Sequence, residues 1–280
     1  MSKKYAMYVG RWQNWHKGHE WLLNQQLERG KDIWVAIRNV PTDENNPKTA
    51  QQVMMDLAEE PFFKENSHKI NISIIPDIES INYGRGVGYE VIYHEPPTDI
   101  EIISGSPRTA SVTHRLALFL EKELKQKTTH NIGIIDVRDW DLGLLNNVFS
   151  TVATTPDKFK PLAERMIAAN AFIIVTPEYN GSYTPALQNL LDHFPKQSRK
   201  AFGIATASVG ALGGSRSSQQ ALLLVPALFG IASPQLLITP TIDKKFDTEG
   251  NLIDESFRKA TDLFIHEFIW LAESIHTKDI

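Results

Sequence analysis

The chain has 280 residues, long enough for one large or two ordinary domains, and its formal net charge is -4. That mild acidity argues against a general nucleic-acid-binding protein, which would carry a basic excess. The absence of cysteine excludes disulfides, thiolate nucleophiles and iron–sulfur clusters. No apolar run is long enough for a signal peptide or a membrane span, so we expect a cytoplasmic protein without a membrane partner.

Short apolar runs alternate with helical patterns in the first hundred residues, which is typical of βαβ units and a parallel sheet. The predicted strands are residues 5–10, 32–40 and 70–76, and the predicted helices are residues 20–30 and 49–60. Residues 83–100 are rich in Gly and Pro and are expected to form a loop and linker. These features predict a small Rossmann-like domain over residues 1–98.

A second α/β series begins at Ile100 and predicts a doubly wound, parallel five-stranded sheet over residues 99–280. Its predicted strands are residues 100–104, 131–137, 171–177, 201–208 and 234–240. Its predicted helices are residues 112–124, 156–170, 185–194, 215–229 and 255–275. The last of these helices has an apolar stripe at helical spacing.

The stretch "GRWQNWHKGHEWLL" follows the first predicted strand and delivers His16 and His19 to the start of a helix. Two imidazoles beside Arg11 and Lys17, at the positive end of a helix dipole, suit the phosphates of a nucleotide. A loop packed only for structure is one alternative. A His-x-x-His metal pair is another, but it lacks a third ligand, so we expect no metal bound by these residues alone.

This stretch resembles the first motif of the HxGH nucleotidylyltransferases, and the likeness extends over residues 5–103, with Asn14 where that family usually has Pro. The resemblance implies transfer of a nucleotide to a phosphate ester with release of pyrophosphate, Mg²⁺ beside the nucleotide, and His16 and His19 as catalytic residues. It implies a phosphate pocket made by Gly10, Arg11, His16, Lys17 and His19.

The second signature of that family, ISxTxxR, matches "ISGSPR" only in part, because Arg108 comes one residue early. The helices that follow this signature in the family are missing, since the second domain begins at once. We therefore expect the first domain to bind a nucleotide with little or no transferase activity.

Three motifs of the second domain follow the first, third and fourth predicted strands: "SGSPRTAS", "TPEYNGSY" and "ASVGALGG". The carboxyl ends of parallel strands meet at one edge of a sheet, where ligands bind near the switch point. The first motif offers hydroxyls, a guanidinium and a helix N-terminus to a phosphate. The second can lie along a planar ring, and the glycines of the third allow close approach. Ordinary loops would explain any one motif, but not three at one edge.

These motifs, together with "FDTEGNLIDE", resemble the NADPH-dependent FMN reductases of the flavodoxin-like fold, over residues 100–275. The resemblance implies FMN as cofactor and NAD(P)H as hydride donor, with a quinone, azo compound or similar small molecule as acceptor. Gln188 stands where the family often has Lys. The implied FMN-binding residues are Ser106, Arg108, Ser111, Thr113, Pro177, Glu178, Tyr179, Asn180, Gly181, Ser182, Ser208, Gly210, Gly213 and Gly214.

Residues 100–104 could end the first domain or begin the second, and we assign them to the second because its sheet is complete only with them. The predicted function is an FMN-dependent NAD(P)H oxidoreductase fused to a nucleotidylyltransferase-like domain. Alternatives are an active nucleotidylyltransferase with the second domain as scaffold, a bifunctional enzyme, and a catalytically silent assembly module. The resemblance and the apolar residues of the helix around Leu222–Leu228 predict a homodimer or homotetramer.

Overall fold

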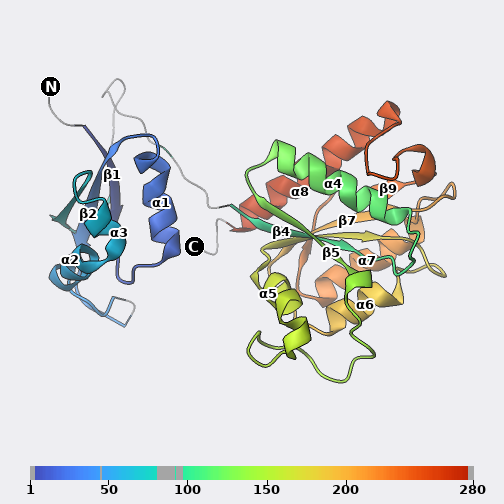
Figure 1. Cartoon of the computed structure of the whole chain (residues 1–280), viewed down its shortest axis with the longest axis horizontal. Helices are drawn as coiled ribbons and strands as arrows, with labels where there is room; N and C mark the ends of the chain where they lie inside the picture. Colours follow the sequence, from blue (N-terminus) through green and yellow to red (C-terminus); the bar gives the residue numbers. More distant parts are fainter. Residues whose placement is uncertain (1–3, 45, 81–91, 93–96, 277–280) are drawn as a thin grey trace. The chain divides into compact units, whose positions relative to one another are not determined.

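The computed structural model describes residues 4–44, 46–80, 92 and 97–276. The chain divides into two compact units, Met1–Pro96 and Pro97–Ile280, which appear in blue and in green to red in Figure 1. Most of the predicted linker, residues 83–91 and 93–96, lies outside the described residues.

Unit 1 contains a parallel sheet in which β2 (Asp32–Asn39) lies between β1 (Tyr5–Gly10) and β3 (Ile70–Pro76). Ile33, Val35 and Ile37 of β2 are fully buried. They belong to one apolar core with residues of α1 (Lys17–Leu27), α2 (Ala50–Glu59) and the short α3 (Pro61–Glu65). Helix α2 begins with a capping box, in which Thr49 and Gln52 bond each other's backbone N–H.

Unit 2 contains a parallel sheet of strand order β5-β4-β6-β7-β8, with β9 also paired to β7. This is the flavodoxin-like order, whose switch point lies between β4 and β6. Residues 100–104 lie in this sheet, as the sequence predicted. The strands are β4 (Asp99–Ser104), β5 (Asn131–Asp136), β6 (Ala171–Thr176), β7 (Ala201–Ala207), β8 (Ile231–Ala232) and β9 (Leu237–Thr239).

Helices cover both faces of this sheet (Figure 1). On one face, α4 (Thr113–Lys127) and α8 (Arg258–His276) share an apolar core with the sheet. The opposite core is formed with α5 (Lys160–Ala168), α6 (Pro185–Asp192) and α7 (Ser215–Ala227). Strands β6 and β7 are buried along their whole length, which explains their continuous apolar sequence.

The fifth predicted strand, residues 234–240, is wrong in detail, because two short strands share this position beside β7. Ser233 N–H still donates to Phe202 O at 2.7 Å, but Pro234 has no N–H to continue the ladder. The chain leaves the sheet there and returns to β7 at Leu237. The predicted five-stranded sheet therefore has six strands in five positions.

Candidate functional site

Three loops of unit 2 follow the carboxyl ends of β4, β6 and β7: residues 105–112, 177–184 and 208–214. Parallel strands place these loops at one edge of the sheet, with the first two on either side of the switch point. All the residues predicted to bind FMN lie in these loops, apart from Thr113, the first residue of α4.

The 105–112 loop presents backbone N–H groups without partners. Gly105 is anchored by its own N–H, which donates to Val175 O at 2.8 Å, and by its carbonyl, which accepts from the Thr184 hydroxyl. In the described part of the chain, the N–H groups of Ser106 and of residues 108–113 donate to no other group. The buried Ser111 Oγ likewise has no partner there. Free amides in a loop at a helix N-terminus are a common anion-binding arrangement.

The 177–184 loop is a two-residue hairpin turn. Tyr179 and Ser182 exchange backbone hydrogen bonds of 2.8 and 3.0 Å. Between them, Asn180 and Gly181 have φ of 52° and 83°, the left-handed pair that a type I′ turn requires. The Arg108 guanidinium lies 4.9 Å from the centroid of the Tyr179 ring, so this turn meets the 105–112 loop through a cation–π contact.

Helix α7, which directly follows the 208–214 loop, is joined to the 177–184 loop. The Glu178 carboxylate accepts from Arg216 N and from Arg216 NH1, each at 3.2 Å, and Ser217 Oγ donates to Pro177 O. Glu178, one of the predicted FMN ligands, is thus engaged with α7. Within the loop, Ser208 N–H donates to Thr239 O, which fixes its start beside β9.

Two glycines of the 208–214 loop are required by the backbone, and one is not. Gly213 and Gly214 have φ of 60° and 84°, and an added Cβ would lie 2.6 Å from Pro240 N or 2.9 Å from Thr206 Cβ. Gly210 is exposed, and its nearest neighbour would be Ser208 Oγ at 3.6 Å. A side chain at position 210 would therefore meet no close contact.

Sequence reasoning missed three residues beside the 105–112 loop: His114, Asp136 and Arg138. Asp136 ends β5, and Arg138 bonds both its carboxylate and the carbonyl of Thr109. The available signal was an acidic residue near the end of the predicted strand, residues 131–137, and a basic residue directly after it. Gln188, at the position where the family often has Lys, donates a hydrogen bond of 2.6 Å to Asp192.

The histidines of unit 1 lie at the start of α1. His16 is the N-cap, its Nδ1 accepts from Gly18 N at 3.1 Å, and its ring stacks on His19 at 3.8 Å. Burial, and then the positive charge that His16 can carry, lower the pKa of His19 to about 4. His19 is therefore neutral at pH 7 and contributes no charge to anion binding.

Other residues of the predicted phosphate pocket have different surroundings. Gly10 is the last residue of β1 and does not lie in a tight turn. A Cβ there would lie 2.9 Å from Trp12 Nε1, so the glycine leaves space for the indole. The unusual φ of 55° belongs to Trp12. Arg11 donates to Asn46 Oδ1 at 3.1 Å, and Lys17 is exposed.

A cavity of about 450 Å³ beside His16 is mainly acidic and aromatic. Its charged lining consists of Lys17 and three glutamates, and its aromatic lining is Trp15 and Phe62. This charge balance does not favour a polyphosphate. The lining glutamates are Glu20, Glu60 and Glu65.

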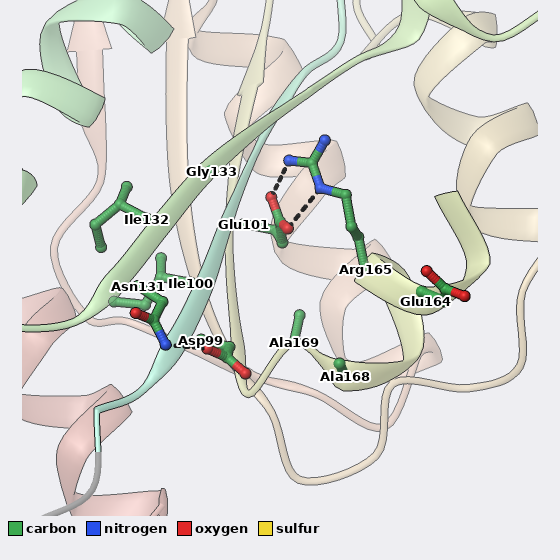
Figure 2. A pocket seen from close by; sticks show the side chains of 10 residues that line it. All are labelled: Asp99, Ile100, Glu101, Asn131, Ile132, Gly133, Glu164, Arg165, Ala168 and Ala169. Atoms are coloured by element: carbon green, nitrogen blue, oxygen red, sulfur yellow. Dashed lines mark hydrogen bonds and ion pairs between the residues drawn. The ribbon is translucent and has the colours of Figure 1, made fainter. Parts of the chain in front are cut away.

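A further cavity of about 490 Å³ lies at the amino ends of β4 and β5, and so at the opposite end of the sheet from the three loops (Figure 2). Its cation, Arg165, donates from Nε to Glu101 at 2.8 Å in a paired contact. A Cβ at Gly133 would lie 2.8 Å from both partners, so that glycine makes room for the ion pair. This cavity is separate from the predicted flavin site.

In the residues that the structure describes, no group of three or more His, Asp or Glu side chains is placed to hold a metal ion. Within the same residues, no helix is long and apolar enough to cross a membrane.

The fold of unit 2 is that of a flavodoxin-like α/β domain, with the 105–112 and 177–184 loops on either side of its switch point. The profile of the NADPH-dependent FMN reductase family matches residues 98–240, and the chain belongs to that family. It is thus an oxidoreductase that uses FMN and NAD(P)H.

Two similar proteins illustrate this relationship. An FMN-dependent NADPH-azoreductase of Staphylococcus aureus is 32% identical over 179 residues, which are 60% of this chain and 92% of the relative. The solved structure of FerB, a flavoenzyme NAD(P)H:(acceptor) oxidoreductase from Paracoccus denitrificans, is 20% identical with a TM-score of 0.52. That match covers 62% of this chain and 97% of FerB, and it supports the fold of unit 2.

Proposed function

We propose that the chain is an FMN-dependent reductase that passes hydride from NAD(P)H to an azo compound, a quinone or a similar small acceptor. The observation that carries the proposal is the 105–112 loop, with its run of unpaired amides and the orphaned Ser111 hydroxyl. These groups fit a phosphate monoester such as that of FMN. The named activity of the S. aureus relative supports the azo acceptor.

In this proposal each loop has a separate task. The amides of residues 108–113, the hydroxyls of Ser106, Ser111 and Thr113, and Arg108 bind the phosphate. The turn at Asn180–Gly181 and the backbone at Gly210 would approach the flavin ring with N–H groups that have no partner among the described residues, and such groups favour negative charge on the ring. FMN, when bound, supplies the hydride chemistry, and the chain orients it and its partners.

An absorption spectrum of the purified protein, followed by an NADPH oxidation assay, tests this proposal. We expect the purified protein to bind one FMN per chain with visible flavin absorbance, and to oxidise NADPH steadily when an azo dye or quinone is added. A matched variant with Ser111→Ala should bind FMN more weakly. Flavin binding without NADPH oxidation, whichever acceptor is offered, would leave a silent binding module and contradict the proposal.

A second candidate function concerns unit 1, which we propose to be a nucleotide-binding domain with little transferase activity. The stacked His16–His19 pair at the N-terminus of α1 supports it, because that place suits a phosphate. Against turnover, His19 is neutral at pH 7, and Glu20, Glu60 and Glu65 border the cavity. Loss of a single transition-state donor typically costs a hundredfold to a thousandfold, about 3–4 kcal/mol.

Pyrophosphate release from ATP and CTP over a panel of phosphorylated acceptors tests this second proposal. We expect release close to background, and nucleotide binding that weakens in a His16→Ala, His19→Ala double variant. Rapid release by the parent protein that vanished in the double variant would show instead a bifunctional enzyme.

We also propose that the protein forms a homodimer or homotetramer through unit 2. Large apolar side chains are exposed on α7 and just after it, with Leu223 70% and Phe229 64% exposed. A second copy of this face would cover them with like residues, as a twofold interface does. Light scattering at micromolar concentration should give a multiple of 31.6 kDa, and a monomer mass would contradict this proposal.

A further inference from the structure

A chain of polar contacts connects the end of β4, the first turn of α4 and the end of β5. His114 Nδ1 lies 2.9 Å from Ser104 Oγ and 3.2 Å from Asp136 Oδ2. Asp136 is 6% exposed, and a buried carboxylate needs partners that satisfy both oxygens. Most of these partners come from Arg138, whose Nε lies 2.9 and 3.1 Å from Oδ1 and Oδ2 and whose NH2 also binds Oδ2.

The remaining arm of Arg138 reaches the middle of the 105–112 loop, where NH1 donates to Thr109 O at 3.1 Å. A trans peptide is planar, so the N–H of Ala110 points opposite to the Thr109 carbonyl. Fixing that carbonyl on the Arg138 side therefore fixes the amide in the reverse direction. That amide is one of those without a partner in the described residues.

We propose that Arg138, held in place by Asp136, is a positioning residue for the FMN phosphate: it orients the peptide between Thr109 and Ala110 so that its N–H is preset for the phosphate. The inference rests on the proposed phosphate site in the 105–112 loop. It gives a function to the segment after β5, which supplies none of the predicted FMN ligands. A fork-shaped guanidinium suits this task because it binds carboxylate and carbonyl in fixed directions at once.

A purely electrostatic effect and the positioning role predict opposite changes in FMN affinity, so the direction of the change distinguishes them. Asp136→Asn removes a negative charge next to a phosphate site, so simple electrostatics predicts tighter FMN binding. Positioning predicts weaker binding, because Arg138 loses its charged anchor. Asp139→Asn is the matched control: Asp139 is exposed, also neighbours Arg138, and makes no hydrogen bond or ion pair with any described residue. Arg138→Lys keeps the charge and loses the fork.

The experiment measures the dissociation constants of FMN and riboflavin for the flavin-free, full-length protein by fluorescence titration. Riboflavin lacks the phosphate, so its affinity reports whether the rest of the flavin site is intact. We expect Asp136→Asn and Arg138→Lys each to weaken FMN by about tenfold, the usual scale of one charge-assisted hydrogen bond, and to leave riboflavin within about twofold. Asp139→Asn should leave both ligands within about twofold.

Arg108→Ala, measured in parallel, separates this inference from the proposed phosphate site. If Arg108→Ala weakens FMN but not riboflavin while Asp136→Asn and Arg138→Lys leave FMN unchanged or tighter, the phosphate site stands and the positioning role is overturned. If none of the variants separates FMN from riboflavin, the phosphate site itself fails. Should Asp136→Asn not fold, Arg138→Lys decides alone, and parental FMN affinity in that variant overturns the inference.

Discussion

Units 1 and 2 begin with the same pattern of parallel strands and crossover helices, but they differ in how their first strands are used. In unit 2 the first strand, β4, is flanked on both sides by β5 and β6. In unit 1 the first strand, β1, pairs only with β2 among the described residues. The comparison teaches that one strand, residues 99–104, determines which unit has a complete sheet edge for binding a ligand.

The sharpest way to break this comparison is to damage β4. Ile102 is fully buried in unit 2, so Ile102→Ala should lower the unfolding free energy of that unit by about 2–5 kcal/mol and leave unit 1 unchanged. FMN release on heating reports unit 2, while tryptophan fluorescence reports mainly unit 1, which has Trp12, Trp15, Trp21 and Trp34 of six tryptophans. Met7→Ala in β1, where the side chain is 47% exposed, is the control.

If the midpoint temperature of the tryptophan fluorescence transition is lower in Ile102→Ala than in the parent, β4 also stabilises unit 1. That outcome would contradict the separate assignment of the strand.

Most of the elements could be predicted because their patterns are local. The strand Ile70–Pro76 has its predicted bounds, and α1 begins three residues before the predicted start because His16 caps it. Strand β8 (Ile231–Ala232) was missed because two apolar residues are too few to predict a strand, and β9 begins three residues after the predicted start at Pro234. Helix α3 was missed as well, since five residues are too few for a periodic signal.

The site could be predicted at the level of loops but not of contacts. Three motifs after parallel strands must meet at one edge, so their neighbourhood follows from topology. The contact of Arg138 with Thr109 spans 29 residues, and that of Arg216 with Glu178 spans 38. Such pairs depend on the packing of separate loops, which periodicity and composition do not encode.

Arg108 provides the next largest effect, confined to unit 2. Arg108→Ala should weaken FMN binding by about 1.5–3 kcal/mol, the scale of hydrogen bonds to charged groups. Fluorescence titration with FMN measures it. Lys125→Ala removes an equal charge from the last turn of α4, and its FMN affinity should match the parent. Equal affinity in Arg108→Ala and the parent would show that the phosphate lies elsewhere.

Acid should lower the unfolding free energy of unit 1 through His19, and this effect is smaller than the two above. Its pKa of about 4 in the folded chain lies below the ordinary 6.5, so only the unfolded chain takes up a proton as pH falls between those values. The shift would amount to roughly 3 kcal/mol if fully expressed, and partial exposure reduces the expected loss to about 1–2 kcal/mol. This loss is absent above pH 6.5 and complete below pH 4.

Chemical denaturation of unit 1 at pH 7 and pH 4.5, followed by tryptophan fluorescence, measures this effect. His19→Gln should lose less stability than the parent on acidification, whereas His68→Gln, at an exposed position, should behave like the parent. An identical acid response in His19→Gln and the parent would rule out His19 as the source.

The interior place of β4 also sets an order for folding during synthesis. Its neighbours begin at Asn131 and Ala171, so β4 leaves the ribosome before either edge has a partner. The sheet edge that carries the three loops cannot form until β6 is synthesised. The turn at Asn180–Gly181 comes shortly after that strand. Unit 1 has all its described strands by Pro76 and can fold through that interval. The reductase half is thus the late and slow folder of the chain, dependent on pairings distant in sequence.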